Sequence, residues 1–247
     1  MSNLDFPTQV VKLPFQGKLY PKESPLSSGQ VELKYMTAKQ EDILTNLSYI
    51  EDGTVIDRML QSLIVDKTID IKDLFIGDKN KLVIAARILG YGKEYEVSFN
   101  KETYTIDLSK LEDKPLHSEF EKATINRFQF TLPECGKTIT FKFLNGHDET
   151  EIQEEVKNLQ KVLKPEDISE SEIKLARQIV AVDGDESLKT VRNFIQKQFR
   201  IKDVRAFRKY ANDIQPDVDL IYKEIDGLEG GVRIPMGISF FWPDLGL

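Results

Sequence analysis

Between residues 37 and 93 the apolar side chains recur at intervals of three and four, the spacing of amphipathic helices. The stretch TAKQEDILTNL starts at Thr37 and has Gln40 three residues later, an arrangement typical of a capping box at a helix N-terminus. A second helix is expected after the Asp-Gly pair at 52–53, and a third from Asp78 to Gly90 in GDKNKLVIAARILG. The pattern therefore predicts a helical domain over residues 37–93.

Between residues 94 and 147 apolar and polar positions alternate, as they do in strands that bury one face. EYEVSF and TYTIDL are two expected strands, and RFQFTLPECGKTITFKFL predicts a hairpin with a Pro-Glu-Cys-Gly turn. Its two strands place apolar side chains opposite one another, namely Phe128, Phe130 and Leu132 against Ile139, Phe141 and Phe143. We expect residues 94–147 to form an antiparallel β subdomain with a sheet of about four strands.

Helical spacing returns in residues 148–247. Helices are expected over Thr150–Leu163, over SESEIKLARQIVAVDG with Ser169 or Ser171 as N-cap, from near Asp185, and over KDVRAFRKYAND with Asp203 as N-cap. The final GVRIPMGISFFW reads as extended. This segment is predicted to be a C-terminal helical region that ends in an aromatic tail.

Residues 1–36 lack helical periodicity and contain FPTQVVKLPFQGKLYPKESPLSSG, with four prolines that favour extended backbone. Apolar anchors interrupt this segment, among them Leu13, Phe15 and Tyr20. A disordered linker would carry fewer such anchors. We therefore expect an extended arm that packs either on its own domain or on a neighbouring protein.

The aromatic tail, residues 237–247, is the most apolar stretch at either end of the sequence. It contains Phe240, Phe241, Trp242 and Leu245. Chain termini are usually polar unless they are held in place, so the tail either folds into its own core or is offered to a partner. The fold class predicted overall is α+β: an N-terminal extended arm and helical domain, a small antiparallel β-hairpin sheet, and a C-terminal helical region ending in an extended aromatic strand.

The charge pattern adds a second candidate surface. The 247 residues carry a net charge of −7, yet residues 189–209, which we call the basic stripe, hold eight bases and the single acid Asp203. Acidic segments flank this stripe on both sides. A stripe of this kind is either satisfied within its own fold or docks an acidic partner, with Arg192, Arg200 and Arg205 as candidate contacts.

The residues that usually carry chemistry do not form a recognisable site. His117 and His147 have no partner at metal-ligand spacing, and the single cysteine, Cys135, excludes an internal disulfide and a multi-cysteine zinc site. CGKT at 135–138 has Thr131 where a phosphate-binding loop needs glycine. We predict no catalytic residue, metal or cofactor; a hydrolase that uses surface carboxylates survives only as an unspecific alternative. No apolar run reaches the length that spans a bilayer, so no membrane partner is expected.

Four stretches within residues 11–146 together resemble a known family. They are VKLPFQGKLYPKESPLSSGQVELKYMTAKQEDILTN, GTVIDRMLQSLIVDKTI, DLFIGDKNKLVIAARILGYGKEYEV and NRFQFTLPECGKTITFKFLNG. This combination is similar to the base plate hub proteins of T-even-type contractile-tailed bacteriophages.

The resemblance implies a non-enzymatic late protein of the viral tail. Its role would be that of a hub subunit or of a hub assembly factor or chaperone, in the host cytoplasm during assembly or in the tail base plate of the virion. Binding to other hub or tail proteins would use the arm, the aromatic tail and the basic stripe. The residues alone leave one alternative, a nucleic-acid-binding module that uses the stripe, although the net charge of −7 disfavours it.

Overall fold

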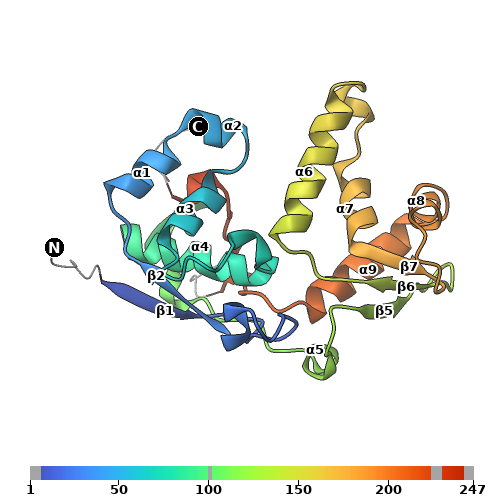
Figure 1. Cartoon of the computed structure of the whole chain (residues 1–247), viewed down its shortest axis with the longest axis horizontal. Coiled ribbons are helices and arrows are strands. Elements are labelled where there is room, and N and C mark those ends of the chain that lie inside the picture. Colours follow the sequence, from blue (N-terminus) through green and yellow to red (C-terminus); the bar gives the residue numbers. More distant parts are fainter. Residues whose placement is uncertain (1–6, 100–101, 224–229, 242–247) are drawn as a thin grey trace. The chain divides into compact units, whose positions relative to one another are not determined.

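The structure is a computed structural model that describes residues 7–99, 102–223 and 230–241. It is a mixed α+β fold, as predicted (Figure 1). Two compact units are present: unit 1 combines residues 1–115 with 216–247, and unit 2 is residues 116–215. Unit 2 is therefore inserted into the sequence of unit 1. The division into 1–36, 37–93, 94–147 and 148–247 follows the order of elements along the chain and stays a prediction.

Unit 1 contains four helices and three hairpins within the described residues. The helices are α1 (Ala38–Leu44), α2 (Leu47–Glu51), α3 (Val55–Leu63) and α4 (Ile76–Tyr91). The hairpins pair β1 (Thr8–Lys12) with β2 (Gln30–Lys34), β3 (Glu94–Phe99) with β4 (Glu102–Asp107), and β8 (Ile221–Tyr222) with β9 (Val232–Arg233). The capping box is confirmed, because Gln40 Oε1 accepts a 2.9 Å hydrogen bond from the Thr37 N–H.

The predicted limits of the third helix, 78–90, are slightly wrong. Helix α4 begins at Ile76 and continues through Gly90 to Tyr91. It ends where Gly92 adopts a φ of +85°, a conformation that glycine tolerates better than other residues. Asp78 therefore lies inside the first turn of α4 and not at its start.

The arm forms a hairpin in unit 1. β1 and β2 are antiparallel, with Val11 opposite Val31, and Val11, Leu13 and Leu33 are buried in the same apolar core as α3 and α4. Of the two alternatives for the arm, the structure shows the first: it packs on its own unit. The prolines shape the loop between the strands and do not keep the segment apart from the core.

The two chain segments that connect unit 1 to unit 2 pair with each other inside unit 1. The Lys114 N–H donates to the Asp217 carbonyl and the Asp219 N–H donates to the Glu112 carbonyl, both at 2.8 Å. Gly77 in α4 lies against the same segment: a Cβ there would be 2.0 Å from the Pro216 carbonyl oxygen. Close approach of helix and backbone thus requires glycine at this position.

Unit 2 is built on a three-stranded antiparallel sheet in the order β5 (Phe128–Thr131), β6 (Thr138–Phe141), β7 (Ile179–Val182). Its helices are α5 (Ser118–Lys122), α6 (Gly146–Gln160), α7 (Glu170–Gln178), α8 (Leu188–Lys197) and α9 (Ile201–Ile214). The predicted hairpin is confirmed, and its register places Phe128 opposite Phe141 and Phe130 opposite Ile139. Phe207 of α9 packs edge-on against Phe141, with 5.1 Å between ring centroids.

The prediction of one sheet with about four strands is wrong. β3 and β4 form a two-stranded sheet in unit 1, whereas β5 and β6 belong to unit 2 and take β7 as their third strand. The sequence IVAV of β7 was expected to continue the preceding helix, which instead ends at Gln178. A short apolar run has the same pattern in a buried strand as in a buried helix.

Two expected helix caps have different outcomes. Ser169 caps α7 as predicted, because its hydroxyl accepts from the Glu172 N–H. Asp203 is not the cap of α9: that helix begins at Ile201, so Asp203 lies in its first turn. Its buried carboxylate accepts a 2.8 Å hydrogen bond from the Glu134 N–H and ties the β5–β6 turn to α9.

Candidate partner-binding surfaces

The predicted contact residues of the arm lie inside unit 1. Leu13 and Phe15 are buried, and Tyr20 is mostly covered. The Phe15 ring stacks on Phe75 with 4.4 Å between centroids, and the Tyr20 ring lies 4.9 Å from the same phenylalanine. Their side chains thus serve the core of their own unit in this conformation, and a role for them in partner binding stays a prediction.

A buried carboxylate holds the arm on α4. Asp78 is fully buried, and its two oxygens accept hydrogen bonds from the Phe15 N–H at 2.8 Å and from the Tyr20 hydroxyl at 2.6 Å. Burial raises the pKa of Asp78 to about 7, although both hydrogen bonds act in the opposite direction. Burial, followed by the charge of Asp78, also raises the pKa of Tyr20 well above its usual value. The sequence pattern indicates only a helix start at Asp78, because the partners of its carboxylate lie about sixty residues earlier in the chain.

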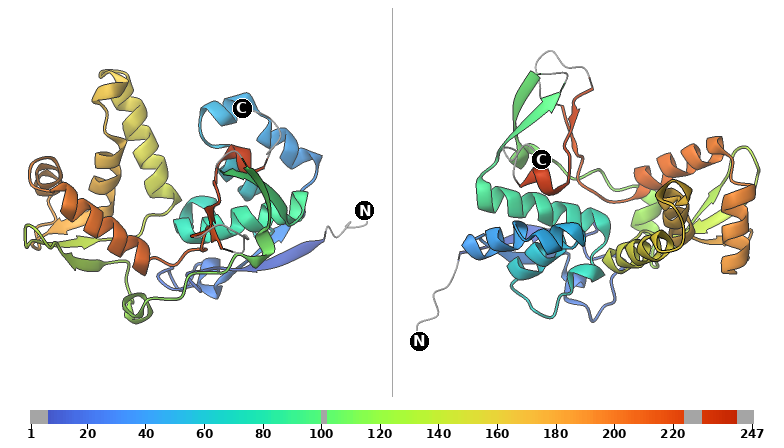
Figure 2. Two further views of the ribbon diagram at one scale, coloured as in Figure 1. Left: turned by 180° about the vertical axis from the view of Figure 1, so that it is seen from behind. Right: turned by 90° about the horizontal axis from the view of Figure 1, so that it is seen from above.

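The aromatic tail enters the core of unit 1 at Phe240 and Phe241, which are 0 % and 1 % exposed. Figure 2 shows the C-terminal segment beside the β3–β4 hairpin, and the Phe240 ring lies 5.1 Å from Tyr95 of β3. The buried Arg87 guanidinium donates a 3.0 Å hydrogen bond to the Phe240 carbonyl. These two phenylalanines are therefore core residues, whereas Trp242 and Leu245 lie outside the described residues.

The basic stripe covers α8 and α9, and part of it is neutralised within unit 2. Arg192 forms an ion pair with Glu155 of α6 at 2.9 Å, and Lys202 approaches Glu134 at 3.6 Å. Arg208 contacts the Ser171 hydroxyl. Five other cations are exposed and form no ion pair within the described part of the chain: Lys189, Lys197, Arg200, Arg205 and Lys209. Of the three predicted arginines, Arg200 and Arg205 are thus available to a partner and Arg192 is already paired.

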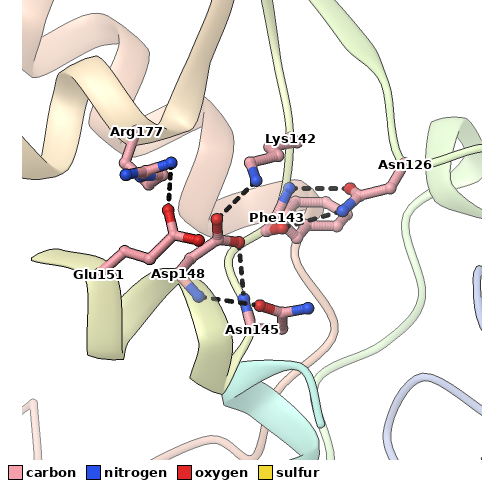
Figure 3. A network of polar contacts seen from close by, with 7 residues as sticks. All are labelled: Asn126, Lys142, Phe143, Asn145, Asp148, Glu151 and Arg177. Carbon is pink, nitrogen blue, oxygen red and sulfur yellow. Dashed lines mark hydrogen bonds and ion pairs between the residues drawn. The ribbon is translucent and has the colours of Figure 1, made fainter. Parts of the chain in front are cut away.

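A polar network fixes the point where the sheet of unit 2 leads into α6 (Figure 3). Asn126 hydrogen-bonds both backbone groups of Phe143, at 2.8 and 2.9 Å. Asn145 caps α6 by accepting from the Asp148 N–H, while the Asp148 carboxylate accepts from the Asn145 N–H and from Lys142 Nζ. Because these hydrogen bonds hold the segment after β6 and the first turn of α6, the network sets the direction in which α6 leaves the sheet.

A second ion pair fastens α6 to α7, since Arg177 lies 2.5 Å from Glu151 (Figure 3). Together with the cap, it holds the two helices as one antiparallel pair. A pocket of about 340 Å³ opens between α6, α7 and α8, with Leu159, Ile168, Ile173 and Ile195 among its lining residues. Leu159, Ile173 and Ile195 fall in three separate helices predicted from the sequence, but only the fold brings them into one concave surface.

Neither a metal-binding cluster nor a helix that could span a membrane is found among the described residues. Among them no group of three or more His, Cys, Asp or Glu side chains could hold a metal ion. In the same part of the chain, every helix is too short or too polar to cross a bilayer. What the structure does present is surface: exposed cations on α8 and α9, and an apolar pocket beside them.

Comparison with known proteins gives a single positive finding. The sequence profile of the T4 bacteriophage base plate protein family matches residues 8–226, most of the chain. Neither the curated proteins nor the solved structures provide a match. The matched range includes the arm hairpin, all nine α-helices of the described residues and the whole of unit 2. The chain therefore belongs to the T4 bacteriophage base plate protein family.

Proposed function

We infer that the chain takes part in building the central hub of the base plate, as a hub subunit or as a hub assembly factor. The observation that carries this proposal is the family match over residues 8–226. The hub assignment within the base plate is supported by the resemblance of residues 11–146 to hub proteins. The protein would act without catalysis, by binding other base plate or tail proteins. It would do so in the host cytoplasm during assembly, whether or not it stays in the virion tail.

The basic stripe is the surface that we assign to this binding. Four of its five unpaired cations lie on α8 and α9, and the fifth, Arg200, directly precedes α9; the apolar faces of both helices are fixed by the core of unit 2. Exposed charges on a rigid surface mainly steer association and set specificity. The partner surface would therefore be acidic, and the complex would weaken as salt is added. Trp242 and Leu245 of the tail are further proposed contacts.

Mass spectrometry of purified particles and of infected-cell lysate tests the role. Recovery from particles at the stoichiometry of other hub proteins would identify a hub subunit. Recovery from lysate together with hub proteins, but not from particles, would identify an assembly factor. If the tagged protein recovers no base plate protein from lysate, the proposed function is wrong.

Charge reversal tests the surface. The double variant Arg200→Glu/Arg205→Glu should recover base plate proteins at least about tenfold less well than the unchanged chain, because two attractive contacts become repulsive. The matched control is Lys39→Glu/Lys122→Glu, which changes net charge equally at exposed lysines outside the stripe. Equal recovery with both variants would exclude the stripe as the binding surface.

Nucleic-acid binding is the second candidate, because the same five unpaired cations could bind phosphates. Such binding falls steeply with salt concentration, and its slope reports the number of phosphate contacts. An electrophoretic shift with duplex or single-stranded DNA at low salt that is lost in the Arg200→Glu/Arg205→Glu variant would support it. The net charge of −7 and the acidic neighbours of the stripe favour a protein partner.

A further inference from the structure

Among the residues that the structure describes, strand β1 has one paired edge and one open edge. The Leu13 N–H donates to the Gly29 carbonyl, and the Tyr35 N–H donates to the Pro7 carbonyl. In an antiparallel pair the residues alternate between those that bond across the ladder and those whose backbone groups point away. The odd-numbered residues of β1 therefore bond to β2. The N–H and C=O groups of Val10 and Lys12 point to the opposite side.

The outer edge of the partner strand is covered, and that of β1 is not. On β2 the Glu32 carbonyl accepts a 3.0 Å hydrogen bond from the Val65 N–H, next to a bridge between Leu33 and Ile64. No hydrogen bond within the described residues reaches the outward backbone groups of Val10 or Lys12. Both residues are exposed, Val10 to 53 %. An uncovered edge of this kind is a template for another strand.

An apolar slot runs along this open edge. A pocket of about 280 Å³ is lined by Gln9 to Lys12 of β1 and by Leu108, Ser109 and Leu111. Ile84, Ala85 and Ile88 of α4 also line it, whereas no residue of β2 does. The slot therefore flanks the outer edge of β1. It offers apolar contacts for the side chains that an added strand would direct toward α4.

Of the two lysines that line the slot, one is paired with an acid within the described residues and the other is not. Lys81, one of its lining residues, is neutralised by Asp113 at 2.7 Å. Lys12, at the C-terminal end of β1, is exposed and has no ion pair among the residues that the structure describes. A segment lying along β1 would thus meet an apolar surface over most of its length and a single positive charge near one end.

We propose that the outer edge of β1 receives an extended segment of another base plate protein, which adds a strand to the β1–β2 hairpin. That segment has apolar residues at alternate positions, facing α4, and a carboxylate opposite Lys12. Backbone hydrogen bonds to Val10 and Lys12 provide the pairing, and the slot selects the side chains. The inference rests on the proposed function, because it names a surface and a partner chemistry for the same assembly role.

The direct test is an array of overlapping peptides from the other base plate proteins of the same phage, probed with the full-length chain. Bound peptides should show the alternating pattern with an acidic residue. Amide hydrogen exchange of the full chain with the best peptide should then slow at Val10 and Lys12. No bound peptide, or protection confined to other segments, would overturn the proposal.

Substitution at Val10 separates edge pairing from other contacts. Val10→Pro removes the outward N–H without touching a bond to β2, whereas Val10→Thr keeps both the N–H and the branched shape. We expect Val10→Pro to lose about tenfold or more in peptide affinity and Val10→Thr to lose less than about threefold. Equal affinities would overturn the proposal. If Val10→Pro does not fold, the exchange result at Val10 and Lys12 decides.

The same variants distinguish this inference from the proposed function. If the unchanged chain and Val10→Pro recover base plate proteins equally well from lysate, the edge proposal fails and the assembly role stands. If neither recovers them, the assembly role fails. A dimer in sedimentation that Val10→Pro dissociates would make a second copy the occupant and would overturn the assignment to another protein.

Discussion

Two deletions of different length distinguish the roles of the two halves of the aromatic tail. Deletion of residues 240–247 takes away two phenylalanines that are 0 % and 1 % exposed, whereas deletion of residues 242–247 leaves both in place. Replacing a buried phenylalanine by alanine costs about 3–5 kcal/mol. Phe240 and Phe241 touch each other, with ring centroids 5.7 Å apart, so their losses are not simply additive. The longer deletion should therefore cost roughly 5–8 kcal/mol.

A further loss comes from Arg87. Its buried guanidinium donates a 3.0 Å hydrogen bond to the Phe240 carbonyl. When residue 240 is deleted, this charged donor stays buried without its acceptor. Leaving such a group unsatisfied costs about 1–3 kcal/mol. The two losses together are comparable to the entire free energy of unfolding of an ordinary domain, about 5–15 kcal/mol. We therefore expect unit 1 of the longer deletion to be largely unfolded.

The assay is calorimetry together with amide hydrogen exchange, read separately for residues of unit 1 and unit 2. Fluorescence is unsuitable because both deletions remove the single tryptophan, Trp242. Loss of protection in α4 and β3 with the longer deletion, and its retention with the shorter one, is the expected outcome. A longer deletion that melts within a degree or two of the full chain would refute the assignment of Phe240 and Phe241 to the core.

Three substitutions at buried polar or close-packed positions test the packing within the two units. Folding raises the pKa of Asp78 from about 3.9 to about 7, so between these values the native state binds a proton that the unfolded state has lost. The free energy of unfolding should therefore decrease, by up to a few kcal/mol, as the pH rises from about 4 to about 7. In Asp78→Asn the slope of stability against pH measured by urea unfolding should shrink; an unchanged slope would contradict this. Gly77→Ala should lower the free energy of unfolding by about 1–3 kcal/mol, since its Cβ would meet the Pro216 carbonyl. Asp203→Ala should cost about 1–3 kcal/mol and speed exchange of the Glu134 amide, and no change in that exchange rate would refute the contact.

Sequence pattern predicted the elements whose apolar positions recur over several turns or strands. The capping box at Thr37 and Gln40 and the β5–β6 hairpin are confirmed, because each depends on residues close in sequence. β7 was missed because IVAV has no period that separates a short buried strand from a helix. Its identity is set by β6, nearly forty residues earlier. Local pattern contains no information about such a partner.

The candidate surfaces likewise divide into features set by residues close in sequence and features set by distant ones. The basic stripe could be predicted from charge density alone, but which of its cations are paired could not: Arg192 forms an ion pair with Glu155, whereas Arg200 and Arg205 are exposed. The open edge of β1 could not be predicted. It depends on the segment at residues 64–65 that covers the outer edge of β2, and on how α4 and residues 108–111 approach β1. Burial of Phe240 similarly depends on Arg87 and Tyr95, which precede it by more than 140 residues.

The insertion of unit 2 into unit 1 has a consequence for the order of folding. Val11 of the arm and Phe240 of the tail belong to one apolar core, so that core is incomplete until both ends of the sequence are present. The linkers around residues 113 and 218 pair only when the chain has passed through unit 2 and returned. Contacts so far apart in sequence form slowly, whereas unit 2 is continuous and contains its own sheet and helices. Unit 2 is therefore expected to gain amide protection before unit 1 in pulsed hydrogen exchange during refolding. Earlier protection of α4 than of α9 would show that the core of unit 1 forms without its C-terminal segment.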